Sequence, residues 1–214
     1  MAVTSNTIIG HSSGKVGALY FSRWKGRNRI TSNPQQPEYT RSIVQQYNTN
    51  KLYIIAFMWH VMKYVISYGM RKTPKNWSPI NLFQSVNFDT PFTFDGTADP
   101  DYDPLLLQLS KGNLPPTPIT EVVPSIFPNL YEIRWDTAIT GPQDANDNVS
   151  FAVFSPQEEQ AIMLLNGYVR HGGEAYFGIP SSWAHGQPLL VYIFFNSEPH
   201  DLTSPTTSLL YWYP

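Results

Sequence analysis

Seven short runs of strand-favouring residues near the C-terminus constrain the fold more than any other feature of the sequence. The runs are rich in aromatic and β-branched side chains, and turn-forming pairs such as Gly141-Pro142 separate them. Such a series is typical of an immunoglobulin-like β-sandwich, and the lack of cysteine favours its fibronectin type III variant. We expect Trp135 in the core of this sandwich. The runs lie at residues 119–123, 130–135, 149–154, 166–170, 174–179, 189–195 and 208–213.

The remainder of the chain divides into three regions. Residues 1–37 hold glycines and prolines between short apolar pieces, which predicts an extended arm with a hairpin over residues 15–30. Residues 38–72 predict one or two helices. Eight prolines fall in residues 73–118, which predicts a connecting region with short strands near 91–94 and 105–109. The expected fold is therefore mainly β, with an extended N-terminal arm, a helical middle segment and a C-terminal sandwich over residues 119–214.

The helical region shows apolar residues at steps of three and four. Pro37 and Glu38 stand where a first turn would begin, Gly69 stands where the helix would end, and the polar run 48–51 could divide it in two. Residues 52–70 are long enough to cross a bilayer. Lys63 lies well inside that stretch, at a cost of about 2.5–3.5 kcal/mol. We therefore expect a buried helix and no membrane span.

The few charges are sorted by sign along the chain. Charged residues make up 14% of the sequence, and aromatic residues make up the same share. Residues 1–75 hold eleven bases and one acid, a net charge of +10, whereas residues 76–214 hold three bases and fifteen acids, a net charge of −12. This asymmetry predicts a basic arm that meets nucleic acid or an acidic surface, which could belong to a neighbouring copy of the same protein. A surface so poor in charge is also expected to be partly covered by other chains.

The arm contains the residues that most resemble a binding site. Four bases surround one tryptophan between residues 23 and 29, a composition that suits phosphates and unstacked bases or an acidic protein surface. Docking on protein is favoured, because the other half of the chain supplies the matching charge. The expected interface residues are Lys15, Arg23, Trp24, Lys25, Arg27 and Arg29, and the glycines expected to permit close backbone approach or positive φ are Gly14, Gly17 and Gly26.

A second candidate is an acidic loop with carboxylates at Asp95, Asp99, Asp101 and Asp103. Alternating oxygen ligands could hold calcium, but the spacing of an EF-hand is absent, so the loop is interpreted either as a docking patch for a basic arm or as a calcium site. The segment Gly10-His-Ser-Ser-Gly14-Lys15-Val16 lacks the spacing of a phosphate-binding loop. No arrangement of Ser, His and Asp or of metal-binding histidines stands out, and we expect no enzyme, cofactor or structural metal.

Three segments carry a resemblance to a known family. Ser13-Gly-Lys-Val-Gly17, Ser22-Arg-Trp-Lys-Gly-Arg-Asn-Arg29 and Asn33-Pro-Gln-Gln-Pro-Glu-Tyr-Thr-Arg41 resemble the N-terminal signature of an uncharacterised family from Bacteroidota and their phages. They are also similar to the opening of virion-associated proteins of tailed phages. Further matches in layout are Leu109-Ser-Lys-Gly112 and Tyr176-Phe-Gly-Ile-Pro180. The chain departs from the family at residues 35–38, where Gln-Gln-Pro-Glu replaces Thr-Pro-x-Gln.

The resemblance implies a structural protein of a phage or prophage virion, a capsid or tail component, and no particular reaction. We expect a subunit that self-assembles through its basic arm, docked on acidic neighbouring subunits, with copies of itself and other virion proteins as partners. The alternatives are a virion protein that contacts nucleic acid through the arm and a bacterial surface or adhesive β-sandwich. Residues 1–14 lack the features of a secretory signal, so the expected location is the virion, after assembly in the host cytoplasm.

Overall fold

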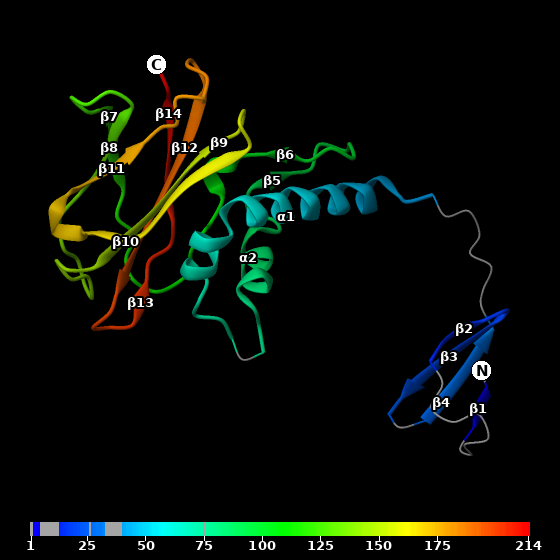
Figure 1. The fold of residues 1–214 in the computed structure, drawn as a ribbon. Helices are drawn as coiled ribbons and strands as arrows, with labels where there is room; N and C mark the ends of the chain where they lie inside the picture. The colour runs from blue at the N-terminus through cyan, green and yellow to red at the C-terminus, as the bar shows by residue number, and fades with distance from the viewer. Residues whose placement is uncertain (1, 5–12, 26, 33–39, 75) are drawn as a thin grey trace. The chain divides into compact units, whose positions relative to one another are not determined.

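The computed structural model describes residues 2–4, 13–25, 27–32, 40–74 and 76–214. The chain divides into two compact units, Met1–Arg41 and Ser42–Pro214, and each is described by itself. The described residues are mainly β, with two α-helices and several antiparallel sheets (Figure 1). The expected mainly β fold with a helical middle segment is therefore confirmed.

The N-terminal unit is a four-stranded antiparallel sheet with the strand order β1-β4-β3-β2. The strands are β1 (Ala2–Thr4), β2 (Gly14–Val16), β3 (Leu19–Trp24) and β4 (Arg27–Ser32). The expected hairpin is present, with Trp24 paired to Arg27 at its turn. The expectation of an extended arm is wrong for these residues. The strands β3 and β4 form a hairpin, β1 pairs with the free edge of β4, and β2 pairs with the free edge of β3, so that the backbone hydrogen bonds of all four strands are made within the sheet.

The middle segment forms α1 (Ile43–Gly69), two helical stretches joined by a kink at Met62, whose φ and ψ of −112° and 25° are not helical. It begins later than expected because Ser42 caps it. The Ser42 Oγ accepts a hydrogen bond from the Gln45 N–H at 3.3 Å, and Gln45 Oε1 accepts one from the Ser42 N–H at 3.0 Å. The polar run 48–51 does not interrupt the helix, and the helix ends at Gly69 as expected. No helix in the described part of the chain has the length and apolar character of a membrane span.

The proline-rich region is more ordered than expected and contains a second helix, α2 (Pro79–Asn87). Ser78 caps this helix and Pro79 occupies its first turn, while Leu82 and Phe83 are buried. A small hairpin follows, formed by β5 (Phe92–Thr93) and β6 (Asp101–Tyr102). The strand expected over residues 105–109 is instead the short 3-10 helix η1 (Pro104–Leu106), because the Asp103 carboxylate caps it by accepting the Leu105 N–H at 2.9 Å.

The C-terminal strands form two antiparallel sheets. The smaller has the order β11-β8-β7, from β7 (Ile119–Pro124), β8 (Leu130–Trp135) and β11 (Glu174–Gly178). The larger places β10 (Gln160–Val169), β9 (Asn148–Ser155) and β12 (Pro188–Ser197) side by side, and β13 (Leu202–Thr203) and β14 (Thr207–Trp212) share the other edge of β12. All seven expected runs contain a strand. β10 starts six residues earlier than residue 166, and its pairing with β9 shifts register between Leu164 and Tyr168.

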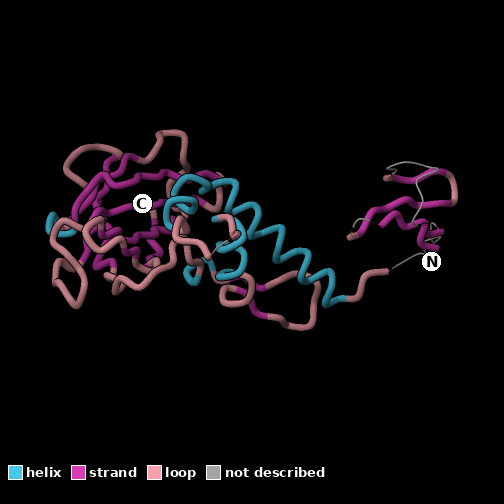
Figure 2. The backbone as a smooth tube through the Cα atoms, turned by 90° about the horizontal axis from the view of Figure 1, so that it is seen from below, coloured by secondary structure: helices cyan, strands magenta, loops and turns pink. Residues whose placement is uncertain are grey.

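The central strands of the larger sheet, β9 and β12, are buried on both faces. One face packs on α1, which lies against it in Figures 1 and 2, and α2 packs in turn on α1. The other face packs on the smaller sheet and encloses Trp135, which is buried as expected. This explains the continuous apolar runs in β9 and β12, since alternation with polar residues is needed only where one face meets water. Side chains toward the helices include Ala152, Phe154, Leu190, Tyr192 and Phe194; those toward the smaller sheet include Phe151, Val153, Val191, Ile193 and Phe195.

Candidate functional site

Three of the expected interface bases share one face of the N-terminal sheet. Residues that are directly paired across antiparallel strands project to the same face. Lys15 pairs with Tyr20, Ser22 with Arg29, and alternate positions of β4 bring Arg27 to the same side. We call this the basic face, made of Lys15, Tyr20, Ser22, Arg27, Arg29 and Thr31. Arg23 lies on the opposite face, Lys25 lies at the hairpin turn with φ of 48°, and Trp24 ends β3.

Two of the three expected glycines adopt backbone conformations that favour glycine. Gly14 has φ of 115° and Gly17, between β2 and β3, has φ of 56°. A Cβ on either residue would meet no heavy atom within 4 Å, so their role is conformational and does not concern close approach. Gly26 lies outside the described residues.

The acidic loop forms the β5–β6 hairpin, and its four carboxylates are exposed. Asp95 Oδ1 accepts hydrogen bonds from the N–H and the Oγ1 of Thr97, at 2.9 and 2.7 Å, and these bonds lower the pKa of Asp95. Asn50 on α1 donates to the carbonyl of Ala98 at 2.9 Å. The hairpin is thereby fixed to α1 with its acids facing solvent.

These carboxylates bind separate groups. Asp95 binds Thr97, Asp103 caps η1, and the Asp99 carboxylate accepts from Asn50 Nδ2 at 3.5 Å. The residues described in the structure include no group of three or more His, Asp or Glu side chains that could hold a metal ion. The docking role of the hairpin remains a prediction.

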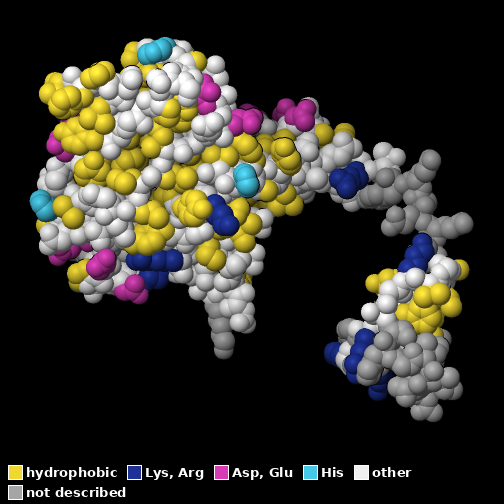
Figure 3. All heavy atoms as spheres, in the orientation of Figure 1, with side chains coloured by type: hydrophobic (Ala, Val, Ile, Leu, Met, Phe, Trp, Pro, Cys, Tyr) yellow, Lys and Arg dark blue, Asp and Glu magenta, His cyan; other side chains and the backbone are white. Residues whose placement is uncertain are grey.

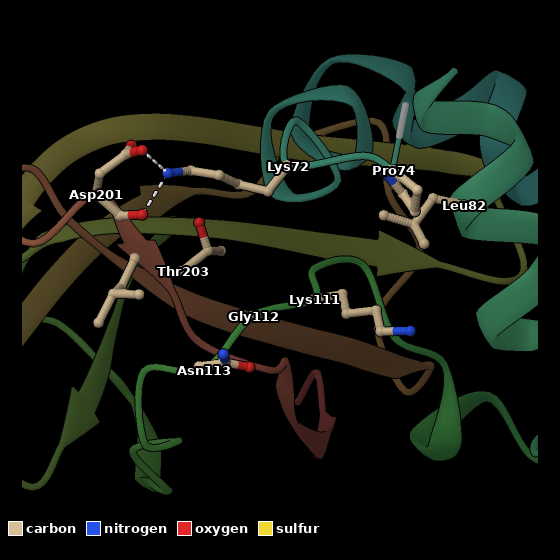
Figure 4. A pocket seen from close by; sticks show the side chains of 9 residues that line it. Lys72, Pro74, Leu82, Lys111, Gly112, Asn113, Asp201 and Thr203 are labelled. Carbon is tan, nitrogen blue, oxygen red and sulfur yellow. Dashed lines mark hydrogen bonds and ion pairs between the residues drawn. The ribbon is translucent and has the colours of Figure 1, made fainter. Parts of the chain in front are cut away.

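A pocket of about 300 Å³ opens between the end of α1, the start of α2 and β13 (Figure 4). The Lys72 ammonium forms an ion pair with the Asp201 carboxylate, which lowers the pKa of Asp201, and also donates to the Asp201 carbonyl. A second ammonium, that of Lys111, and the amide of Asn113 also line the pocket. The lining residues are Lys72, Pro74, Leu82, Lys111, Gly112, Asn113, Asp201, Leu202 and Thr203.

The segment Leu109-Ser-Lys-Gly112 builds one wall of this pocket. The buried Ser110 hydroxyl donates to the Ser204 carbonyl at 2.8 Å, and Thr206 Oγ1 accepts the backbone N–H groups of Leu109 and Ser110 at 2.8 and 2.9 Å. At Gly112 the backbone lies so close to Thr203 that an added Cβ would be 2.0 Å from its carbonyl oxygen. The segment therefore has a structural role, and only Lys111 presents an exposed side chain.

A buried ion pair lies at the edge of the core between the two C-terminal sheets. Arg170 and Asp147 have fully buried side chains, with 3.1 Å between Arg170 Nε and Asp147 Oδ2. The guanidinium also donates to Thr117 Oγ1 and stacks 4.1 Å from the centre of the Phe195 ring. Burial lowers the pKa of Arg170, and the Asp147 carboxylate opposes that shift. With no exposed polar atom in the pair, we assign it a structural role.

The outer face of the smaller sheet carries a second charged group. Arg134 forms ion pairs with Glu132 and with Glu121, the latter at 2.7 Å. The Tyr176 hydroxyl donates to Glu174 at 2.9 Å. The hydrogen bond from Arg134 is the main cause of the lowered pKa of Glu132. One guanidinium on this face therefore joins two carboxylates, Glu121 and Glu132.

We expect stability to depend on pH through Glu132. A carboxylate whose pKa is lower in the folded state stabilises the fold above its unfolded pKa, about 4.3, and loses that effect as the pH falls through the folded value. Urea unfolding of Glu132→Gln should therefore show its largest deficit at pH 7 and a smaller one near pH 3. The exposed Glu159→Gln is the control and should show no such trend. A deficit that is constant with pH would contradict the role of the ion pair.

The sequence located the basic and acidic segments but missed the pocket and the buried ion pair. The segment Leu109-Ser-Lys-Gly112, which forms part of the pocket, is one of the segments that resemble the phage family, but nothing in the sequence indicates that it lines a pocket. Asp147 and Arg170 are far apart in the sequence, each beside a predicted turn, and no pattern in the sequence predicts that they pair. Comparison with protein-family models, with curated proteins and with solved structures gave no match.

Proposed function

We propose that the protein is a structural subunit of a bacteriophage or prophage-derived virion, and that its basic N-terminal unit docks on acidic surface of a neighbouring subunit. The virion assignment rests on the resemblance of residues 13–41. The docking rests on one observation, that a separate small sheet gathers Lys15, Arg27 and Arg29 on one face. Residues 1–41 carry six bases and one acid, whereas residues 42–214 carry eight bases and fifteen acids.

The β5–β6 hairpin is the proposed docking surface. Its exposed carboxylates at Asp95, Asp99 and Asp101 are held in place by α1 through Asn50, so a partner meets a fixed acidic surface. Charge of opposite sign on two surfaces speeds their encounter and selects the partner more than it raises affinity. A virion places many copies close together, where modest affinity at each contact suffices.

We also propose that the two sheets form an immunoglobulin-like sandwich of the fibronectin type III kind, with an added helical layer. The strand order supports this proposal. Leaving β13 aside, the first, second and fifth of the seven strands form one sheet, and the third, fourth, sixth and seventh form the other. In immunoglobulin-like sandwiches the third, sixth and seventh strands likewise share a sheet, and a further strand can join it beside the third.

A nucleic acid is the second candidate partner of the basic face, because Tyr20 lies among the bases and is 47% exposed. An exposed aromatic ring beside cations suits an unstacked base. Such binding weakens steeply with salt. The acidic hairpin in the same protein favours the docking of protein on protein, and the following experiment separates the two.

The double variant Lys15→Glu/Arg27→Glu should lower the mass of the assembly measured by light scattering at low salt, because it reverses two charges of the basic face. Lys63→Glu, at an exposed position on α1, is the matched control and should assemble normally. Adding Asp99→Lys and Asp101→Lys to the double variant should restore assembly, because the hairpin then carries the positive charge and the N-terminal sheet the negative charge. If assembly is unchanged but retention of single-stranded DNA on a filter is lost, the nucleic-acid alternative replaces docking.

A further inference from the structure

The face of the N-terminal sheet opposite the basic face carries a cluster of four apolar side chains. Val16 pairs with Leu19, and Phe21 pairs with Ile30, so these four side chains share one side. We call them the apolar face; Arg23 and Asn28 lie at one end of it, and Ser32 lies at the other. Val16 is 68% exposed and Leu19 is 45% exposed, while Phe21 and Ile30 are half-buried. Figure 3 shows hydrophobic side chains of this unit gathered beside its basic ones.

A sheet of this size does not normally fold without cover. A single layer needs a second element against its hydrophobic face for stability, and units of about 40 residues usually depend on disulfides, metals or association. Residues 1–41 contain no cysteine and no aspartate, one histidine (His11) and one glutamate (Glu38). They cannot form a disulfide or supply three metal ligands by themselves. Association is the remaining route.

We propose that the apolar face packs on the same face of a second copy of this chain, as a two-fold symmetric pair of sheets. A second copy fits for reasons of charge. An acidic partner is matched by the basic face, whereas the apolar face offers one charge, Arg23, at its end. Packed sheets lie about 10 Å apart, and Lys15, Arg27 and Arg29 of both copies then point outward, away from each other, while Arg23 stays at the edge of the contact. The two-fold arrangement uses one self-complementary patch.

This inference needs the N-terminal unit, as the proposed docking does, but it uses the opposite face and a different force. Docking between charges weakens in salt, because ions screen exposed charges over about 10 Å at 0.1 M. Apolar packing persists there. Each subunit would then have two kinds of neighbour. One pairs with it through the apolar face, and the other binds it through the basic face and the β5–β6 hairpin. Two kinds of contact are sufficient to extend an assembly.

The test compares two neighbouring residues on opposite faces in the full chain. Leu19→Lys should reduce the mass in sedimentation velocity from two copies to one at high salt. Tyr20→Lys, at a position of similar exposure on the basic face (47% against 45%), should leave the pair intact. In the wild type, protection of the β3 and β4 amides from hydrogen exchange should rise with protein concentration, in step with pairing.

Three results would overturn the proposal. One is equal loss of pairing in both variants, and another is a wild-type chain that stays single at high salt. The third is protection of β3 and β4 that does not change with concentration, which would mean that the sheet is covered within its own chain. Pairing that survives in Lys15→Glu/Arg27→Glu at high salt would support this inference even if docking fails.

Discussion

Replacing Asp147 with asparagine should lower the free energy of unfolding by about 3–5 kcal/mol. The substitution keeps the shape of the side chain but leaves the Arg170 guanidinium, which is fully buried, without its countercharge. The same oxygen, Asp147 Oδ2, also accepts the Asp144 N–H at 3.0 Å, a bond that the amide oxygen of asparagine can keep, so the variant isolates the loss of charge. Small domains are stable by roughly 5–15 kcal/mol, and the loss is thus a large share of the total.

Urea unfolding followed by tryptophan fluorescence measures this effect, since the Trp135 indole donates to the Arg170 carbonyl at 2.8 Å. Asp144→Asn is the matched control in the same turn. Asp144 is partly exposed and accepts one local N–H, from Asn146 at 2.8 Å, so its loss should be about 1 kcal/mol or less. The double variant Asp147→Asn/Arg170→Met should recover stability, because it leaves no unpaired charge. Equal losses in both single variants would refute the importance of the buried charge.

Replacing Gly112 with alanine should lower the free energy of unfolding by about 3 kcal/mol or more. The added Cβ would lie 2.0 Å from the carbonyl oxygen of Thr203 and 2.8 Å from its carbonyl carbon. Both are backbone atoms and cannot rotate away. The same oxygen accepts the Leu114 N–H at 3.1 Å, so the shift that relieves the clash also breaks the contact between this segment and β13.

Gly172→Ala is the matched control for that substitution. An added Cβ at Gly172 meets no heavy atom within 4 Å. Its main effect is on the unfolded chain, where alanine has less freedom than glycine, and a gain of about 0.4–1 kcal/mol is expected. Thermal unfolding of both variants should therefore shift the midpoint in opposite directions. A loss of similar size in both would indicate that the close approach at Thr203 does not limit the fold.

The strands of the C-terminal region could be predicted from sequence because each of them is encoded locally. The run from Tyr131 to Trp135 and the run that contains Tyr192 favour strands by composition, whatever they pair with. The same is true of the β3–β4 hairpin. The spacing of apolar residues predicts helix α1. The predicted start at Pro37 is too early, because the helix begins after the capping box formed by Ser42 and Gln45.

The remaining features depend on contacts between distant residues. Position 112 must be glycine because the backbone of Thr203 lies against it, and Arg170 is paired with Asp147. In both pairs the partner is far away in the sequence, and no spacing pattern identifies it. The helix α2 was hidden by the prolines around it, although Ser78 and Pro79 form a recognisable helix start. The basic and acidic segments were found because charge is visible in a sequence, while the face that each base occupies required the register of the strands.

Strand β12 belongs to both hydrophobic cores, with Tyr192 and Phe194 on the helical side and Ile193 and Phe195 on the side of the smaller sheet. The helical layer and the smaller sheet thus have a common wall. A disturbance on one side moves a strand on which the other side is built, because packed interiors transmit strain. A substitution that reshapes the helical core is therefore expected to alter the packing of the smaller sheet as well.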